Sequence, residues 1–170
     1  MPAQIPPDIF KAVMQNVAAT VTVVTAYGPT EPVGITVSAF TAVSADPPII
    51  LVCIDKGAAS LETLLAADGF TVNFLAQGSA DTAMIFATRD GDKFGAVKWD
   101  PPEVEGSGPV LDEAFEVFEC TTVDRHEVGD HWVIYGQVVE AVVRSGIPLV
   151  YLNRTFVDLD VDNAHPSSDV

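Results

Sequence analysis

The side chains that could hold a phosphate are few in this 170-residue sequence, which has eight lysines and arginines against 24 aspartates and glutamates. The formal net charge is −16. Nucleic acids and anionic membranes are bound through clustered cations, so this composition argues against both as partners. A phosphate-bearing small ligand would have to use backbone N–H groups or some of these residues: Lys11, Lys56, Arg89, Lys93, Lys98, Arg125, Arg144 and Arg154.

Two histidines, His126 and His131, stand close to several carboxylates and raise the question of a metal site. Their spacing matches no common set of metal ligands. A hairpin that places the two histidines at opposite ends of its turn explains the spacing better. The sequence has no GxGxxG, Walker, HExxH or GxSxG motif, so no nucleotide, metal or nucleophile signature points to a mechanism.

The cysteines indicate neither a disulfide framework nor a metal centre, because Cys53 and Cys120 lie far apart in apolar runs and form no CxxC. We expect buried free thiols. The amino-terminal residues do not read as a signal peptide, and no apolar run reaches membrane-spanning length. A cytoplasmic protein is the expectation.

Polar residues inside β-rich segments are the more informative candidates. Thr36 and Ser38 share one face of a predicted strand, where they could face either a ligand or solvent. Asn73 interrupts an apolar strand, and a buried amide needs either a ligand or an internal hydrogen-bond partner. The residues alone leave both alternatives open.

The elements that would position these side chains are mostly strands. Asp8 is a candidate N-cap for a short amphipathic helix that we expect to pack on the body of the protein. Residues 88–108 are rich in glycine, proline and charge and predict a loop. The remaining pattern predicts helices over 60–67 and 79–87 and strands over 20–26, 33–44, 49–54, 70–75, 114–123, 132–143 and 149–152.

Strands do not alternate regularly with helices, which argues against a Rossmann sheet and favours an antiparallel barrel with helices filling gaps. No linker divides the chain. We expect a single domain over residues 1–157, followed by an acidic, disordered tail over 158–170.

Taken together, the segments resemble the short-chain flavin reductase family, the FMN-binding split-barrel reductases that supply reduced flavin to two-component monooxygenases. The matching segments occur in family order over roughly residues 8–157: FKAVMQNVAATVTVVT, GITVSAFTAVSADPPIILVCI, FTVNFL, FATRDGDKFGAV, GDHWVIYGQV and PLVYL. The resemblance implies a mainly β fold, an antiparallel Greek-key split β-barrel with a few short peripheral helices. It also implies a homodimer, with flavin held at or near the interface between the subunits.

The resemblance implies roles for particular residues. Lys93 matches the family's phosphate-facing lysine, and His131, the candidate catalytic residue, matches a histidine on the nicotinamide side. The other residues that match flavin-binding segments are Thr36, Val37, Ser38, Cys53, Ile54, Asp55, Lys56, Ser60, Asn73 and Phe74.

The activity implied is hydride transfer from NADH or NADPH to FMN or FAD, for a separate oxygenase component. The cofactors supply the reactive atoms, so the protein's task is to stack two rings and stabilise developing charge. The chain departs from the family's pattern at Ala39, Ser79, Met84 and Ile85, and at the segment YLNRTF, which leaves the choice of nucleotide open. Two alternatives are a flavin-retaining electron-transfer protein and a non-catalytic split barrel that binds another planar ligand such as haem.

Overall fold

The computed structural model describes residues 4–161. The helices are α1 (Pro7–Met14), α2 (Leu61–Ala66) and α3 (Ala80–Ala87). The strands are β1 (Ala19–Thr20), β2 (Thr22–Tyr27), β3 (Pro32–Val37), β4 (Phe40–Ala45), β5 (Pro48–Asp55), β6 (Gly69–Leu75), β7 (Trp99–Asp100), β8 (Val110–Leu111), β9 (Ala114–Val128), β10 (His131–Val143), β11 (Val150–Leu152) and β12 (Thr155–Val157). The predominance of β structure is confirmed, but the segment 33–44, expected as one strand, forms two, β3 and β4, with a break at Ser38 and Ala39.

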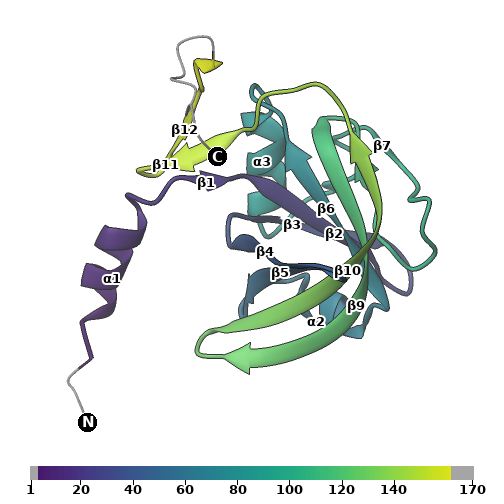
Figure 1. Cartoon of the computed structure of the whole chain (residues 1–170), viewed down its shortest axis with the longest axis horizontal. Helices are drawn as coiled ribbons and strands as arrows, with labels where there is room; N and C mark the ends of the chain where they lie inside the picture. Colours follow the sequence, from purple (N-terminus) through teal and green to yellow (C-terminus); the bar gives the residue numbers. More distant parts are fainter. Residues whose placement is uncertain (1–3, 162–170) are drawn as a thin grey trace.

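The main sheet has seven antiparallel strands in the order β3-β2-β6-β9-β10-β5-β4. It curls so that β3 comes close to β5, and the barrel remains split between the edge strands β3 and β4 (Figure 1). The two edge strands are consecutive in the chain and are separated only by Ser38 and Ala39. A second sheet of β1, β11 and β12 lies beside the barrel, and α3 packs against β3.

The barrel core consists of β-branched and aromatic side chains, which suit a half-buried pleated surface. Every residue of β6 is buried, because the strand is covered on both faces. One face meets the apolar interior, where the Phe74 ring packs edge-on against Phe40 and Phe118 at centroid distances of 5.0 and 5.3 Å. The other face is covered by the segment 107–111, whose backbone needs polar partners.

Those partners explain the polar residues inside apolar strands. The Thr25 and Thr71 hydroxyls donate to the carbonyls of Pro109 and Gly108 at 2.6 and 2.7 Å, and the Asn73 amide oxygen accepts from the Leu111 N–H at 2.8 Å. The Asn73 amide therefore has an internal hydrogen-bond partner, which was the alternative to a ligand that the sequence left open.

The β9–β10 hairpin is longer than the sequence predicts, since both strands continue to a two-residue turn at Gly129 and Asp130. Gly129 has φ +59°, a conformation that glycine adopts without strain. His126 and His131 lie on either side of this turn, as expected.

The expected packing of the first helix is wrong. α1 begins at Pro7 with Pro6 rather than Asp8 at the N-cap, none of its residues is buried, and it projects away from the barrel (Figure 1). Helical periodicity identifies an apolar face but not what covers that face.

Ser79 lies at the N-cap of α3 without a capping hydrogen bond from its side chain, and Met84 on the same helix is exposed. Of the predicted tail, residues 158–161 belong to the described part of the chain and 162–170 lie outside it.

Candidate functional site

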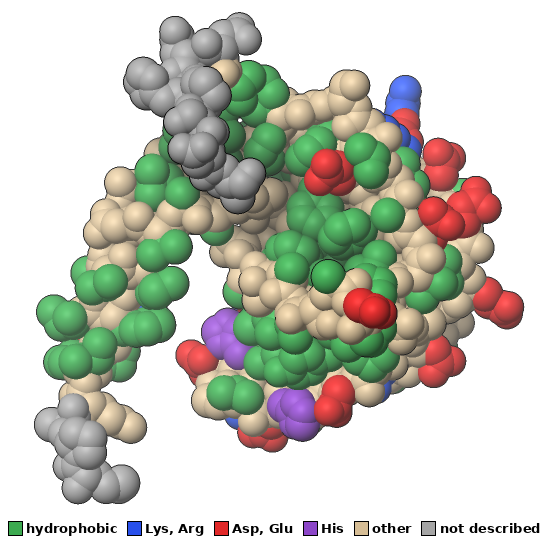
Figure 2. Space-filling model, in the orientation of Figure 1, with side chains coloured by type: hydrophobic (Ala, Val, Ile, Leu, Met, Phe, Trp, Pro, Cys, Tyr) green, Lys and Arg blue, Asp and Glu red, His purple; other side chains and the backbone are tan. Residues whose placement is uncertain are grey.

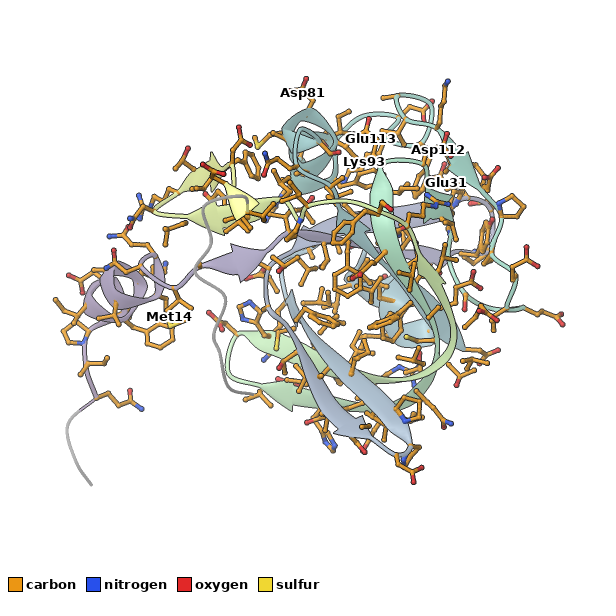
Figure 3. The ribbon with its side chains drawn as sticks, turned by 45° about the horizontal axis from the view of Figure 1, so that its top comes forward. Met14, Glu31, Asp81, Lys93, Asp112 and Glu113 are labelled. Carbon is orange, nitrogen blue, oxygen red and sulfur yellow. The ribbon has the colours of Figure 1, made fainter. Side chains whose placement is uncertain are left out.

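Three adjoining hollows beside α3 all share Lys93 as a lining residue, and their volumes are about 290, 500 and 190 Å³. They lie between the edge strand β3, the carboxyl end of α3 and two loops, 55–60 and 88–94. Figure 3 labels Lys93 together with Glu31, which lines the first hollow. The hollow region around Lys93 is therefore the candidate binding site.

Lys93 is half-buried, and its ammonium donates only to two carbonyl oxygens, those of Gly34 at 3.2 Å and Phe86 at 3.3 Å. Burial lowers the pKa of this ammonium from its ordinary value. Among residues 4–161, no carboxylate forms an ion pair with it. In a chain with a large acidic excess, a half-buried cation without a carboxylate partner is suited to an anionic ligand.

Local packing fixes the position of Lys93. A side chain on Gly34 would lie 2.6 Å from the Phe86 ring, so glycine is required there for α3 to approach β3 this closely. The Phe86 ring is fully buried and its centroid lies 6.0 Å from the Lys93 ammonium. The close helix–strand contact thus places the two carbonyls that hold the ammonium.

Ser60 supplies a second polar group at the same site. Its residue is 6% exposed and lines two of the hollows, and its hydroxyl is buried without a hydrogen-bond partner. A buried hydroxyl without a partner is costly, so this group fits a ligand that offers an acceptor.

Arg89 is a third polar group, and it was not among the predicted site residues. Its guanidinium lies over the turn at Gly57, where a Cβ would come within 3.3 Å of the Arg89 Nη2 atom. Arg89 lines the same two hollows as Ser60 and forms no ion pair within residues 4–161. The sequence feature that could have pointed to Arg89 is its position in the same predicted loop as Lys93, four residues before it.

Two of the acidic residues that line these hollows accept hydrogen bonds from backbone groups rather than pairing with the cations. Asp92 accepts from the Gly95 N–H at 2.8 Å and Asp55 from the Gly57 N–H at 2.6 Å. Both carboxylates therefore shape the two loops. Lys93, Arg89 and Ser60 remain available to a phosphate, the group that flavin mononucleotide and flavin adenine dinucleotide carry on their ribityl chain.

Thr36 and Ser38 line a separate apolar hollow of about 160 Å³ with Met84, Tyr151 and Phe156. The Thr36 hydroxyl donates to the Ala83 carbonyl at 2.6 Å and so ties β3 to α3. Ser38 is exposed at the break between the edge strands. The structure thus places these two predicted residues on the α3 side of β3, next to the Lys93 region.

Cys53, Asp55 and His131 lie on the outer face of the barrel, where Cys53 pairs with Val133 and Asp55 with His131 across β5 and β10. The His131 Nδ1 atom lies 2.7 Å from an oxygen of Asp130. That hydrogen bond is the main reason that the pKa of Asp130 falls below its ordinary value. Asp55 also lines one of the Lys93 hollows and so links the outer face to them.

The remaining predicted residues do not line these hollows. The side chains of Val37, Ile54 and Phe74 are buried in the barrel core, and that of Asn73 is buried on the opposite face of β6, against the segment 107–111. The Lys56 ammonium contacts Glu127 at 2.5 Å and the Gly129 carbonyl at 2.7 Å, which ties the 55–60 turn to the hairpin. For these five residues a flavin contact stays a prediction.

Within residues 4–161, no cluster of three or more potential metal ligands occurs.

Both cysteines are free; Cys120 is buried and Cys53 is half-buried. Within the same residues, no helix is long and apolar enough to cross a membrane.

Residues 14–160 match the family model described as the flavin reductase like domain. The flavin reductase (NADH) of Kitasatospora aureofaciens is 34% identical over 164 residues, which cover 95% of this chain and 86% of the relative. The reductase component of the 4-nitrophenol 4-monooxygenase/4-nitrocatechol 2-monooxygenase of Rhodococcus opacus is 36% identical over 147 residues, covering 86% of this chain and 78% of the relative.

Solved structures agree with the sequence relatives. The NADH:FAD oxidoreductase of Streptomyces globisporus, in complex with NAD and FAD fragments, superimposes with a TM-score of 0.88 at 30% identity, covering 96% of this chain and all of the other. The flavin reductase HpaC, complexed with NADP+, gives a TM-score of 0.83 at 28% identity over 92% of this chain and 99% of the other.

Proposed function

This chain belongs to the flavin reductase-like family, and on that premise we propose that it uses NADH or NADPH to reduce FMN or FAD. The flavin, when bound, accepts a hydride from the nicotinamide ring. The chain itself has to bind the two partners, align their rings and exclude water from between them.

The observation that carries this proposal is the set of unpaired polar groups around Lys93. Within residues 4–161, Lys93 and Arg89 offer positive charge without a carboxylate partner, and the buried Ser60 hydroxyl lacks an acceptor. A ribityl phosphate would satisfy all three groups at once through charge-assisted hydrogen bonds. FMN and FAD both carry a phosphate at this position, so the site suits either flavin.

The ring end of the flavin would extend from the Lys93 region along the outer face of the barrel. Asp55 lines a Lys93 hollow and is followed along that face by Cys53. His131 lies opposite Asp55, where its ring could hold or supply a proton near the nicotinamide. The hydrogen bond that its Nδ1–H donates to the Asp130 carboxylate orients that ring.

The reduced flavin would be passed to a separate oxygenase component. Several relatives are reductase components of monooxygenases, which supports this assignment. We further propose that the chain acts as a homodimer in the cytoplasm, where reduced nicotinamides are available. Its two free thiols are consistent with a reducing compartment.

The proposed function is tested by mixing the purified chain with each of two flavins and each of two nicotinamides and following loss of nicotinamide absorbance. At least one of the four combinations should consume nicotinamide far faster than the same mixture without protein. Background rates in all four would exclude the proposed activity. Riboflavin, which lacks the phosphate, is the matched control ligand and should show a weaker apparent affinity.

A further inference from the structure

The residues assigned to the flavin phosphate lie where two hollows meet. The hollow of about 190 Å³ also reaches Asp55 and so leads toward the outer face of the barrel, where the ring end of the flavin is proposed to lie. The hollow of about 290 Å³ extends the other way along β3, since it is lined by residues 31–34 rather than by Ile35. The residues common to both hollows are Ala59, Ser60, Arg89 and Lys93.

The larger hollow is space that FMN would not reach. FMN ends at its phosphate, whereas FAD continues through a second phosphate to an adenosine. When the first phosphate lies at the shared residues and the ring points toward Asp55, the adenosine half of FAD enters the larger hollow. The two hollows together therefore match the longer flavin.

The walls of the larger hollow suit a planar base. Pro32 and Phe94 both line it. Edge-on ring contacts hold Phe94 in place, at centroid distances of 5.3 Å from Phe86 and 5.8 Å from Trp99. An adenine ring gains apolar contact from groups that are already fixed, because no side-chain freedom is lost when it binds.

Glu31, labelled in Figure 3, is the available carboxylate of this hollow. Its backbone carbonyl accepts from the Gly28 N–H at 3.0 Å, which fixes the turn before β3. Its side chain is exposed and forms no ion pair within residues 4–161. Asp92, the other carboxylate that lines the hollow, already accepts from the Gly95 N–H at 2.8 Å. Ribose hydroxyls donate well to a carboxylate, as they do in dinucleotide-binding folds.

We propose that FAD is the preferred flavin of this chain, and that Glu31 selects FAD by accepting hydrogen bonds from the ribose of its adenosine half. This inference rests on the proposed function, because it starts from the phosphate site at Lys93. It adds the identity of the flavin and a residue that determines specificity.

Charge favours the same choice. The phosphate of FMN is a monoester with about 1.5 to 2 negative charges at pH 7, and the carboxylate of Glu31 opposes the second charge. Each phosphate of FAD carries one charge, and its adenosine carries none. Figure 2 shows many more acidic than basic side chains on the face that it displays, in keeping with the net charge of −16. Beyond Lys93 and Arg89, this protein therefore holds a neutral group more readily than further negative charge.

Calorimetric titration with oxidised FAD and FMN, without nicotinamide, tests the preference independently of catalysis. The wild type should bind FAD at least about tenfold more tightly than FMN. Glu31→Ala should raise the Kd for FAD roughly fivefold, because an exposed charge-assisted hydrogen bond is lost, and should leave the Kd for FMN unchanged or lower. Glu140→Ala is the matched control, since Glu140 is an exposed carboxylate on β10 that lines none of the four hollows, and it should change neither Kd.

Two results would overturn the proposal. Wild-type protein that binds FMN as tightly as FAD overturns the assignment of FAD. A wild-type preference for FAD that Glu31→Ala does not reduce, or equal losses for both flavins in that variant, overturns the role of Glu31.

Nicotinamide oxidation is measured on the same samples with each flavin, so that this proposal and the proposed function fail separately. Protein that reduces FMN and binds it as tightly as FAD overturns the flavin preference and leaves the proposed function intact. Protein that prefers FAD in calorimetry but oxidises no nicotinamide supports the flavin preference and overturns the proposed function.

Discussion

Replacing Lys93 by methionine tests the phosphate assignment most sharply. Methionine keeps the length of the side chain and its packing near Phe86 but removes the charge. In the free protein the ammonium makes two rather long bonds to carbonyls, at 3.2 and 3.3 Å, so it can still donate to a ligand. A charge-assisted hydrogen bond contributes about 1.5–3 kcal/mol.

Because solvent screens the half-buried ammonium, we expect the loss of FMN binding free energy to fall at the lower end of that range, about 1.5–2 kcal/mol. This corresponds to roughly a 10- to 30-fold rise in the Kd for FMN. Titration of flavin fluorescence measures the Kd for FMN and for riboflavin. Riboflavin has no phosphate, so its Kd should hardly change. Lys98→Met removes a charge outside the three hollows and is the matched control. Equal losses for FMN and riboflavin, or no loss for FMN, would refute the reasoning.

Three further predictions follow from the same contacts. Because burial lowers the pKa of Lys93, the unfolded chain keeps the Lys93 proton at a pH where the folded chain has lost it. The free energy of unfolding should therefore rise with pH just below the ordinary pKa range of lysine. Urea titrations of Lys93→Met should no longer show that rise. Asn73→Ala leaves the buried Leu111 N–H without its acceptor and should lower the free energy of unfolding by about 1–3 kcal/mol, while an unchanged midpoint in denaturant would contradict the internal tie. A thiol reagent should modify Cys53 in native protein but not Cys120, whose pKa burial raises to about 12; modification of both at equal rates would count against the packing described.

The strands were the most predictable part of the fold. β-Branched runs such as those of β2 and β6 have few alternatives, and the proline pair at Pro47 and Pro48 marks the turn between β4 and β5. The lengths of β9 and β10 were underestimated. Their polar ends carry no apolar signal, because the hairpin extends beyond the core.

The candidate site was only partly predictable. Lys93 and Ser60 were expected and do lie together, whereas Val37 and Ile54, expected from the same family resemblance, face the core. A linear match cannot separate the inward from the outward residue of a strand. Arg89 was one of eight cations that could meet a phosphate, and it could not be singled out because its place depends on how its loop lies against the turn at Gly57.

The packing of α1 was not predictable from the sequence of one chain. Its apolar spacing predicts burial, but none of its residues is buried within the described part of the chain.

The central claim is that this chain catalyses hydride transfer from a reduced nicotinamide to a flavin bound through Lys93, Ser60 and Arg89. Anaerobic mixing of protein, flavin and nicotinamide, with the bleaching of flavin absorbance followed over time, tests it most directly. The account predicts stoichiometric bleaching that is much faster with wild-type protein than without it, and that needs more FMN in the Lys93→Met variant. Bleaching at the uncatalysed rate would contradict the account.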